Sequence, residues 1–132
     1  MILRTPEDFR EYERNNKYIS HNNIHICSVS EEGAEIRLDI RPESCNVTGP
    51  VHGGMLMTLV DVAAGQAALA NGGNYVTQNC CVNFTSNVQG GTLFARSNVI
   101  KRGKKTALVH VQIHTDEGKL LVDATATLVR LD

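Results

Sequence analysis

Two adjacent glycines and one carboxylate stand out in the otherwise apolar stretch Val51 to Ala64. Gly53 and Gly54 begin a segment with helical apolar spacing, and Asp61 lies two turns further along it. The first N–H groups of a helix have no partner inside it and lie at the positive end of its dipole, so they suit a carbonyl oxygen that gains negative charge. The pattern indicates acyl transfer, with Asp61 as general base or nucleophile. Two alternatives stay open: a plain entry turn at the glycines, and an Asp61 that only hydrogen-bonds a neighbouring loop.

The spacing of these residues has a consequence for assembly. Asp61 follows Gly53 by eight residues, so the two lie about 12 Å apart along a helix axis. One acyl group can hardly touch both within one chain. If they act together, Asp61 must come from a second copy, which predicts a symmetric homodimer with shared active sites.

Length and charge set limits on the class of protein. The chain has 132 residues, which predicts one domain, and its 13 basic and 14 acidic side chains give a net charge of −1. This balance argues against nucleic acid or an anionic membrane as partner. The four cysteines lack metal-site or redox spacing. Without a signal peptide pattern or a long apolar run, the chain is expected to be cytoplasmic.

Hydrophobic periodicity predicts an α+β architecture. A short polar helix is expected from Thr5 to about Tyr18, and a helix that is apolar nearly all round from Gly53 to about Ala70. The second helix is therefore expected to be wrapped by the sheet, whose last four strands should form an antiparallel meander. The expected strands are Ile24 to Val29, Ala34 to Ile40, Val76 to Thr85, Leu93 to Lys101, Thr106 to Thr115 and Leu120 to Arg130.

The run Asn46…His52-Gly53-Gly54…Asp61, followed by long β segments, resembles the PaaI-like branch of the hotdog-fold acyl-CoA thioesterases. The resemblance covers the chain from about Asn22 to its end. It implies a hotdog fold in which a curved antiparallel sheet of five to six strands wraps one long central helix. Residues 1–132 would form a single thioesterase domain, with 1–20 as an N-terminal helical segment. It also implies homodimers with sheets paired edge to edge, which often double into homotetramers.

The same resemblance implies hydrolysis of an acyl-CoA thioester to a free acid and coenzyme A, with no cofactor apart from the coenzyme A of the substrate. Gly53 would polarise the carbonyl, Gly54 would bind substrate, and Asn46 would orient the carbonyl or a water molecule. Whether Asp61 is base or nucleophile stays open. His52 would orient the Gly53 amide or touch the substrate, or else serve as a structural N-cap.

The strand after the central helix supplies a polar side chain that assists the acid in this family. An ungapped count from Asp61 gives Asn79, with Thr77 as an alternative on the same strand. A basic turn further on is either a solvated surface turn or, as the resemblance implies, a site for the phosphates of coenzyme A near the mouth of the acyl tunnel. This turn consists of Lys101, Arg102, Gly103, Lys104 and Lys105.

Two further expectations concern metals and the class of function. His110 and His114 share a predicted strand, where their spacing of four residues corresponds to about 13 Å, so no metal site is expected. No GxSxG elbow, P-loop or GxGxxG motif supports another enzyme class. The alternative to a thioesterase is a non-catalytic protein of the same fold that binds or senses acyl-CoA.

Overall fold

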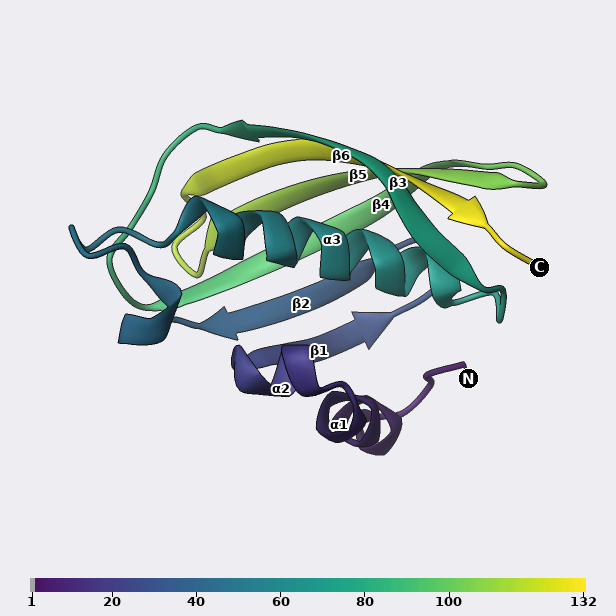
Figure 1. Cartoon of the computed structure of the whole chain (residues 1–132), viewed down its shortest axis with the longest axis horizontal. Helices are drawn as coiled ribbons and strands as arrows, with labels where there is room; N and C mark the ends of the chain where they lie inside the picture. The colour runs from purple at the N-terminus through teal and green to yellow at the C-terminus, as the bar shows by residue number, and fades with distance from the viewer. Residues whose placement is uncertain (1) are drawn as a thin grey trace.

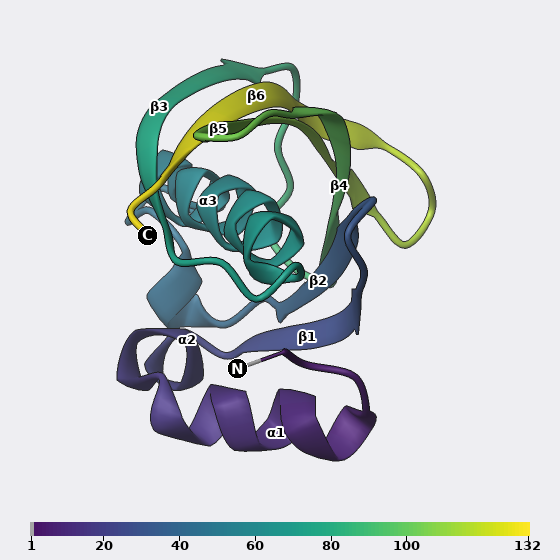
Figure 2. The ribbon, with the colours of Figure 1, turned by 90° about the vertical axis from the view of Figure 1, so that its right-hand side faces the viewer.

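The central helix α3 (Gly53–Leu69) lies in the concave face of a curved antiparallel sheet (Figures 1 and 2). The computed structural model describes residues 2–132. Leu59, Val60 and Ala63 of α3 are completely buried, as the nearly uniform apolar spacing of this segment predicts. The helix ends one residue before the predicted Ala70. This is the α+β hotdog fold that the sequence predicts.

Six strands form one sheet in the order β1-β2-β4-β5-β6-β3, and all neighbours are antiparallel. Figure 2 shows how this sheet curls around α3, with β3 and β6 on one side of the helix and β1 and β2 on the other. A 3-10 turn, η1 (Pro42–Ser44), lies in the connection that precedes α3. The strands are β1 (Ile24–Val29), β2 (Ala34–Asp39), β3 (Tyr75–Phe84), β4 (Thr92–Arg102), β5 (Thr106–Thr115) and β6 (Leu120–Arg130).

The expected four-strand meander is wrong in its first strand. Only β4, β5 and β6 follow one another in the sheet, whereas β3 pairs with β6 at the far edge and β4 pairs with β2. The connection from β3 to β4 spans 85–91 and crosses from one edge of the sheet to its middle. The glycines in this connection, Gly90 and Gly91, therefore do not form a hairpin turn. Local turn signals cannot predict such a crossover, because both strands have the same residue pattern in either topology.

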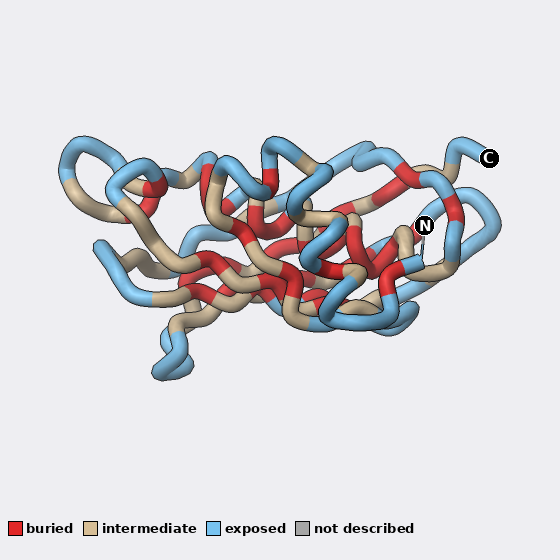
Figure 3. Tube along the Cα trace, turned by 90° about the horizontal axis from the view of Figure 1, so that it is seen from below, coloured by how far each residue is buried: buried red, intermediate tan, exposed pale blue. Residues whose placement is uncertain are grey.

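The alternation in β5 is confirmed by burial. Ala107, Val109, Val111 and Ile113 are completely buried against α3, whereas the intervening side chains face the outer surface. Figure 3 shows that the buried segments gather inside the fold and that exposed segments lie at the turns and chain ends. Among residues 2–132, no helix is long and apolar enough to span a membrane.

The N-terminal segment forms two short helices, α1 (Pro6–Asn15) and α2 (Lys17–His21), instead of the single helix expected to about Tyr18. The break occurs at Asn16, whose backbone is extended and whose side chain accepts the Ile19 amide hydrogen at 3.2 Å. Asn16 thus caps the second helix while ending the first.

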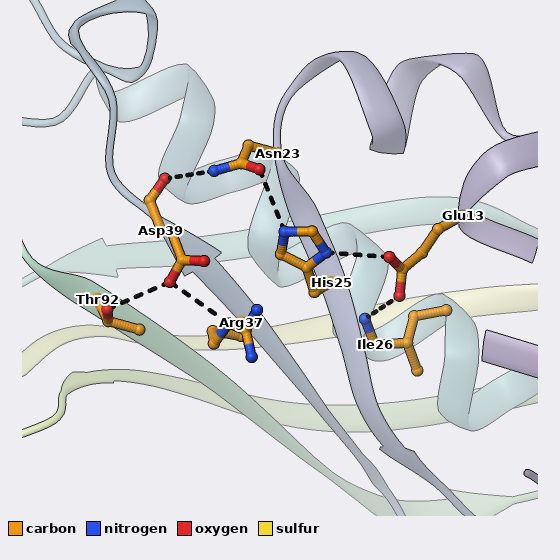
Figure 4. Close-up of polar contacts among 7 residues, drawn as sticks. All are labelled: Glu13, Asn23, His25, Ile26, Arg37, Asp39 and Thr92. Atoms are coloured by element: carbon orange, nitrogen blue, oxygen red, sulfur yellow. Dashed lines mark hydrogen bonds and ion pairs between the residues drawn. The ribbon is translucent and has the colours of Figure 1, made fainter. Parts of the chain in front are cut away.

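A polar cluster anchors α1 to the sheet (Figure 4). Glu13 of α1 accepts the Ile26 amide hydrogen at 2.9 Å and lies 3.0 Å from Nδ1 of His25 in β1. The other ring nitrogen of His25 lies 3.2 Å from Oδ1 of Asn23. The Nδ2 group of Asn23 donates to the Asp39 carbonyl. The α1 helix is therefore held to β1 and β2 through polar contacts as well as the buried Phe9.

The start of α1 gives a pH-dependent prediction. Asp8 accepts the amide hydrogens of Arg4 and Thr5, and these bonds hold the pKa of its carboxyl below the ordinary value. A lowered folded-state pKa means that ionised Asp8 stabilises the fold above its ordinary pKa, and that this contribution disappears as pH falls through the lowered value. Thermal melts should show that Asp8→Asn costs stability at neutral pH but not in strong acid. An equal loss at both pH values would contradict the assignment.

Candidate active site

One backbone N–H group at the start of α3 has no hydrogen-bond acceptor among residues 2–132. His52 is the N-cap, and its Nδ1 accepts the Gly54 amide hydrogen at 2.8 Å. The Met55 amide donates to the His52 carbonyl at 2.9 Å. In the described part of the chain, residues 2–132, the Gly53 amide has no acceptor. The N-cap interpretation of His52 therefore describes this chain, and Gly53 is the donor that remains for a substrate oxygen.

A side chain would have different contacts at Gly53 and at Gly54. A Cβ at Gly54 would lie 3.0 Å from His52 Nδ1, so glycine here lets the imidazole reach the Gly54 amide. A Cβ at Gly53 would meet only the ring of Phe84, at 3.9 Å, which is ordinary contact. The predicted role of Gly54 as a substrate-binding amide is not supported within the single chain, because His52 already takes its hydrogen.

Asp61 is exposed on α3 and is paired with a hydroxyl from β3. Thr77 Oγ1 donates to Asp61 Oδ1 at 2.5 Å. The expectation that Asn79 would be this partner is wrong within the chain, because a bulge between Thr77 and Asn79 adds one residue to β3. After the bulge the strand alternation is reversed, so Cys80 lies against the core and Asn79 is exposed.

Asp61 lies in an open groove of about 810 Å³ between α3, β3 and the N-terminal helices. Cys80 is also in this groove, and burial raises the pKa of its thiol, as does the neighbouring Asp61 carboxylate to a smaller degree. The thiol therefore stays protonated and does not compete as a nucleophile. The groove is lined by Tyr12, Asn16, Tyr18, Ile19, Gly54, Met57, Thr58, Asp61, Val62, Gly65, Gln66, Leu69, Tyr75, Val76, Thr77, Cys80 and Leu128.

The groove also contains a hydrogen-bond chain near the start of α3, which the sequence does not predict. The Tyr18 hydroxyl lies 3.0 Å from Thr58 Oγ1, which donates to the Gly54 carbonyl at 2.9 Å. The position of Thr58, four residues after Gly54, does place it on the same helix face. Nothing in the sequence relates Tyr18 to this face, because their contact depends on how α2 folds back.

Asn46 lies outside the Asp61 groove of its own chain. It belongs to a tight loop before α3, where its amide donates to the Pro50 carbonyl at 2.8 Å. Its exposed side chain lines a separate cavity of about 330 Å³ together with Arg41, Cys45 and Gln89. One chain therefore does not bring Asn46 and Asp61 together.

The basic turn lies between β4 and β5, at the C-terminal end of α3 and away from Gly53 (Figure 1). Arg102 has a structural role there: its guanidinium donates to the carbonyls of Ala67 at 2.8 Å and Ala68 at 3.0 Å, and to Glu31 at 3.1 Å. A cation on these carbonyls complements the negative end of the helix dipole. Arg102 is thus not a free phosphate ligand, in contrast to the expectation. Lys101, Gly103, Lys104 and Lys105 are exposed.

Arg102→Met is expected to lower the free energy of unfolding by about 2 to 3 kcal/mol, because it removes charge-assisted bonds to the last carbonyls of α3, of which that of Ala67 keeps only a long bond of 3.4 Å from the Ala70 amide. Urea unfolding followed by circular dichroism measures this change. Lys104→Met is the matched control, an exposed cation of the same turn whose loss should change stability by less than about 0.5 kcal/mol. Similar values for the two variants would contradict the capping role.

Within residues 2–132, no group of three or more His, Cys, Asp or Glu side chains is arranged to hold a metal ion. His110 is instead paired with Asp123 on the outer face of the sheet, with 2.8 Å between Nε2 and Oδ1.

The sequence and fold identify the class of protein. The family model of the thioesterase superfamily matches residues 48–122, more than half of the chain and a segment that includes all of α3. The chain therefore belongs to the thioesterase superfamily, whose chemistry is thioester hydrolysis.

Within this superfamily the chain is PaaI-like. The acyl-coenzyme A thioesterase PaaI of Escherichia coli K12 is 29% identical over 97 residues, which is 73% of this chain and 69% of that protein. The E. coli PaaI structure has a TM-score of 0.88 at 24% identity, covering 93% of this chain and 90% of that one, and shows the shared hotdog fold.

A second relative, Rv1847 of Mycobacterium tuberculosis H37Rv, is named as an esterase, a broader class than acyl-coenzyme A thioesterase. It is 26% identical over 115 residues, covering 83% of this chain and 82% of that protein. Its structure superimposes with a TM-score of 0.84, covering 87% of this chain and 96% of that one.

Proposed function

We propose that the protein hydrolyses acyl-CoA thioesters to a free acid and coenzyme A, in a homodimer whose active sites are each shared by two subunits. The observation that carries this proposal is the arrangement on α3. Its first residue has an open amide and its ninth, Asp61, has a carboxylate held by Thr77. The helical rise separates them by about 12 Å, so the acid that acts with Gly53 comes from the second subunit.

The edge of the sheet supports this pairing. The ten-residue strand β3 is the last strand, and its outer edge has no partner strand in the described chain. A long bare edge is a template for another strand, and stable proteins usually cover it. Val76 and Phe84, near the two ends of β3, are 48% and 51% exposed, and Met57 on the neighbouring α3 face is 48% exposed. A second copy that adds its own β3 would cover these apolar side chains.

The reaction follows from the groups on this surface. The Thr77 hydroxyl occupies Asp61 Oδ1 and fixes the carboxylate, so that Oδ2 is directed to a water molecule or to the thioester carbon itself. Attack on the carbonyl carbon places negative charge on its oxygen, which the partner's open helix-start amide stabilises. Collapse of the tetrahedral intermediate breaks the carbon–sulfur bond and releases coenzyme A as a thiolate, which then takes up a proton. If water attacks, with its proton passing to Asp61, the other product is the free acid; if Asp61 attacks, it is an acyl–Asp61 anhydride, which a water molecule then hydrolyses to the free acid.

Other residues are assigned binding roles in this proposal. The Asn46 side chain lies in the loop before α3 and would orient the carbonyl or water from the Gly53 side of the shared site. The exposed Lys101, Lys104 and Lys105 would bind phosphates of coenzyme A, since antiparallel pairing of two α3 helices places the basic turn of one subunit near the start of the other's helix. A relative from Streptococcus pneumoniae with a TM-score of 0.80 has been solved with coenzyme A.

The experiment is a release assay with a thiol-reactive dye and a panel of acyl-CoAs, combined with light scattering to measure the mass in solution. We expect thiol release from at least one acyl-CoA by a species of twice the chain mass. Tight binding of acyl-CoA without thiol release would instead identify a non-catalytic sensor. A monomer with full activity would contradict the shared site.

A further inference from the structure

One buried polar side chain in the groove has no role in the proposed hydrolysis. Gln66 of α3 is only 4% exposed and lines the same groove as Asp61. In the described residues, 2–132, no hydrogen bond satisfies its side-chain amide. The amide atoms are not closed off from solvent, so they reach the groove that Gln66 lines. A polar group of a ligand that enters the groove can therefore bind the Gln66 amide in place of water.

The surroundings of Gln66 restrict what that partner is. Its neighbours on the groove wall include the apolar Val62, Leu69 and Leu128, while Tyr12 and Asn16 contribute polar groups from the N-terminal helices. Asp61 is the one charged side chain among the described residues that line the groove. A carboxylate in the ligand would thus meet a like charge and no cation, whereas a neutral hydroxyl or keto oxygen would satisfy the amide.

We infer that Gln66 is a specificity residue that selects acyl groups with a neutral hydroxyl or keto oxygen along the chain. This inference rests on the proposed thioesterase function. Gln66 follows Asp61 by five residues, which corresponds to about 7.5 Å along the helix axis. This distance matches roughly six bonds between the thioester carbon and the polar oxygen, as in a six-carbon acyl chain with a terminal hydroxyl. The amide offers both a donor and an acceptor, so it can bind either kind of oxygen.

The test compares three acyl-CoAs of equal chain length: hexanoyl-CoA, ω-hydroxyhexanoyl-CoA and adipoyl-CoA. We expect wild type to prefer the hydroxylated ester over hexanoyl-CoA by about tenfold in kcat/KM, the value of one well-placed hydrogen bond, and to reject adipoyl-CoA. Gln66→Met, which keeps the side-chain length, should abolish the preference by slowing the hydroxylated substrate. Gln112→Met, the same change on the outer sheet face, should leave the preference unchanged.

Two further readouts separate this inference from the proposed function. Thermal shift with the same esters measures binding whether or not they are hydrolysed, and should show the same preference and its loss in Gln66→Met. Gln66→Met without ligand should melt no lower than wild type and remain a dimer, because no protein contact is removed. Equal kinetics and binding for the two neutral esters in wild type would overturn the inference while leaving the thioesterase intact. A lower melting temperature or a dissociated dimer would show that Gln66 is bonded across the subunit interface, and would also overturn it.

Discussion

Replacing Asp61 with asparagine is expected to lower kcat/KM for acyl-CoA hydrolysis by about 10²- to 10⁴-fold, the usual contribution of a positioned base. Asparagine has the same shape, and its amide oxygen can still accept the Thr77 hydroxyl that Asp61 Oδ1 accepts at 2.5 Å. The fold should therefore be preserved, while the group that removes a proton or attacks carbon is lost. Thiol release under second-order conditions measures the change.

Asp123→Asn is the matched control for this substitution. Asp123 lies on the outer face of the sheet, where Gln112 and His110 hydrogen-bond its carboxylate and lower its pKa. This variant should retain wild-type turnover. If Asp61→Asn released thiol as fast as wild type, Asp61 would have no catalytic role and the proposal would be rejected.

Gly53→Pro is expected to reduce kcat by about 10²- to 10³-fold, because it deletes the Gly53 N–H group, which has no acceptor among residues 2–132. Gly53 is the first helical residue, the position that proline favours, and His52 before it has φ −62° and ψ 133°, which proline tolerates. The nearest side chain, Phe84, leaves room for a Cβ at 3.9 Å. The circular dichroism spectrum and melting temperature should remain those of wild type.

Gly53→Ala serves as the control for this variant, since it adds a Cβ but keeps the amide hydrogen. It should retain most of the activity. A Gly53→Pro variant with wild-type kcat would show that the oxyanion is stabilised elsewhere.

Mixing the two inactive variants tests whether subunits share the site. After unfolding and refolding together in equal amounts, Asp61→Asn and Gly53→Pro should recover about one quarter of wild-type activity, because half of the dimers are hybrids and each has one intact site. A site contained in one chain would give no recovery.

The sequence predicted the elements of this fold better than their connections. The apolar spacing around α3 and the alternation in β5 depend on local periodicity, and both matched the structure. The place of β3 beside β6 depends on a crossover between elements that are distant in the chain. No local pattern distinguishes that topology from a meander.

In the candidate site, too, the sequence predicts the features that depend on local geometry and not those that depend on contacts between distant elements. The open amide of Gly53 and the position of Asp61 follow from helix geometry, so the sequence predicts them directly. The choice of Thr77 over Asn79 depends on one extra residue in a bulge, which an ungapped count cannot detect. The capping of α3 by Arg102 depends on where a hairpin turn 34 and 35 residues away comes to lie.

With the shared site proposed above, the separation of Gly53 and Asp61 along α3 would make catalysis depend on protein concentration. A solitary chain would then contain every reactive group yet no complete centre, so turnover per molecule would fall as dilution drives the subunits apart. A few copies would have no catalytic effect until their number permits association, and the strength of the β3 edge contact would set that threshold.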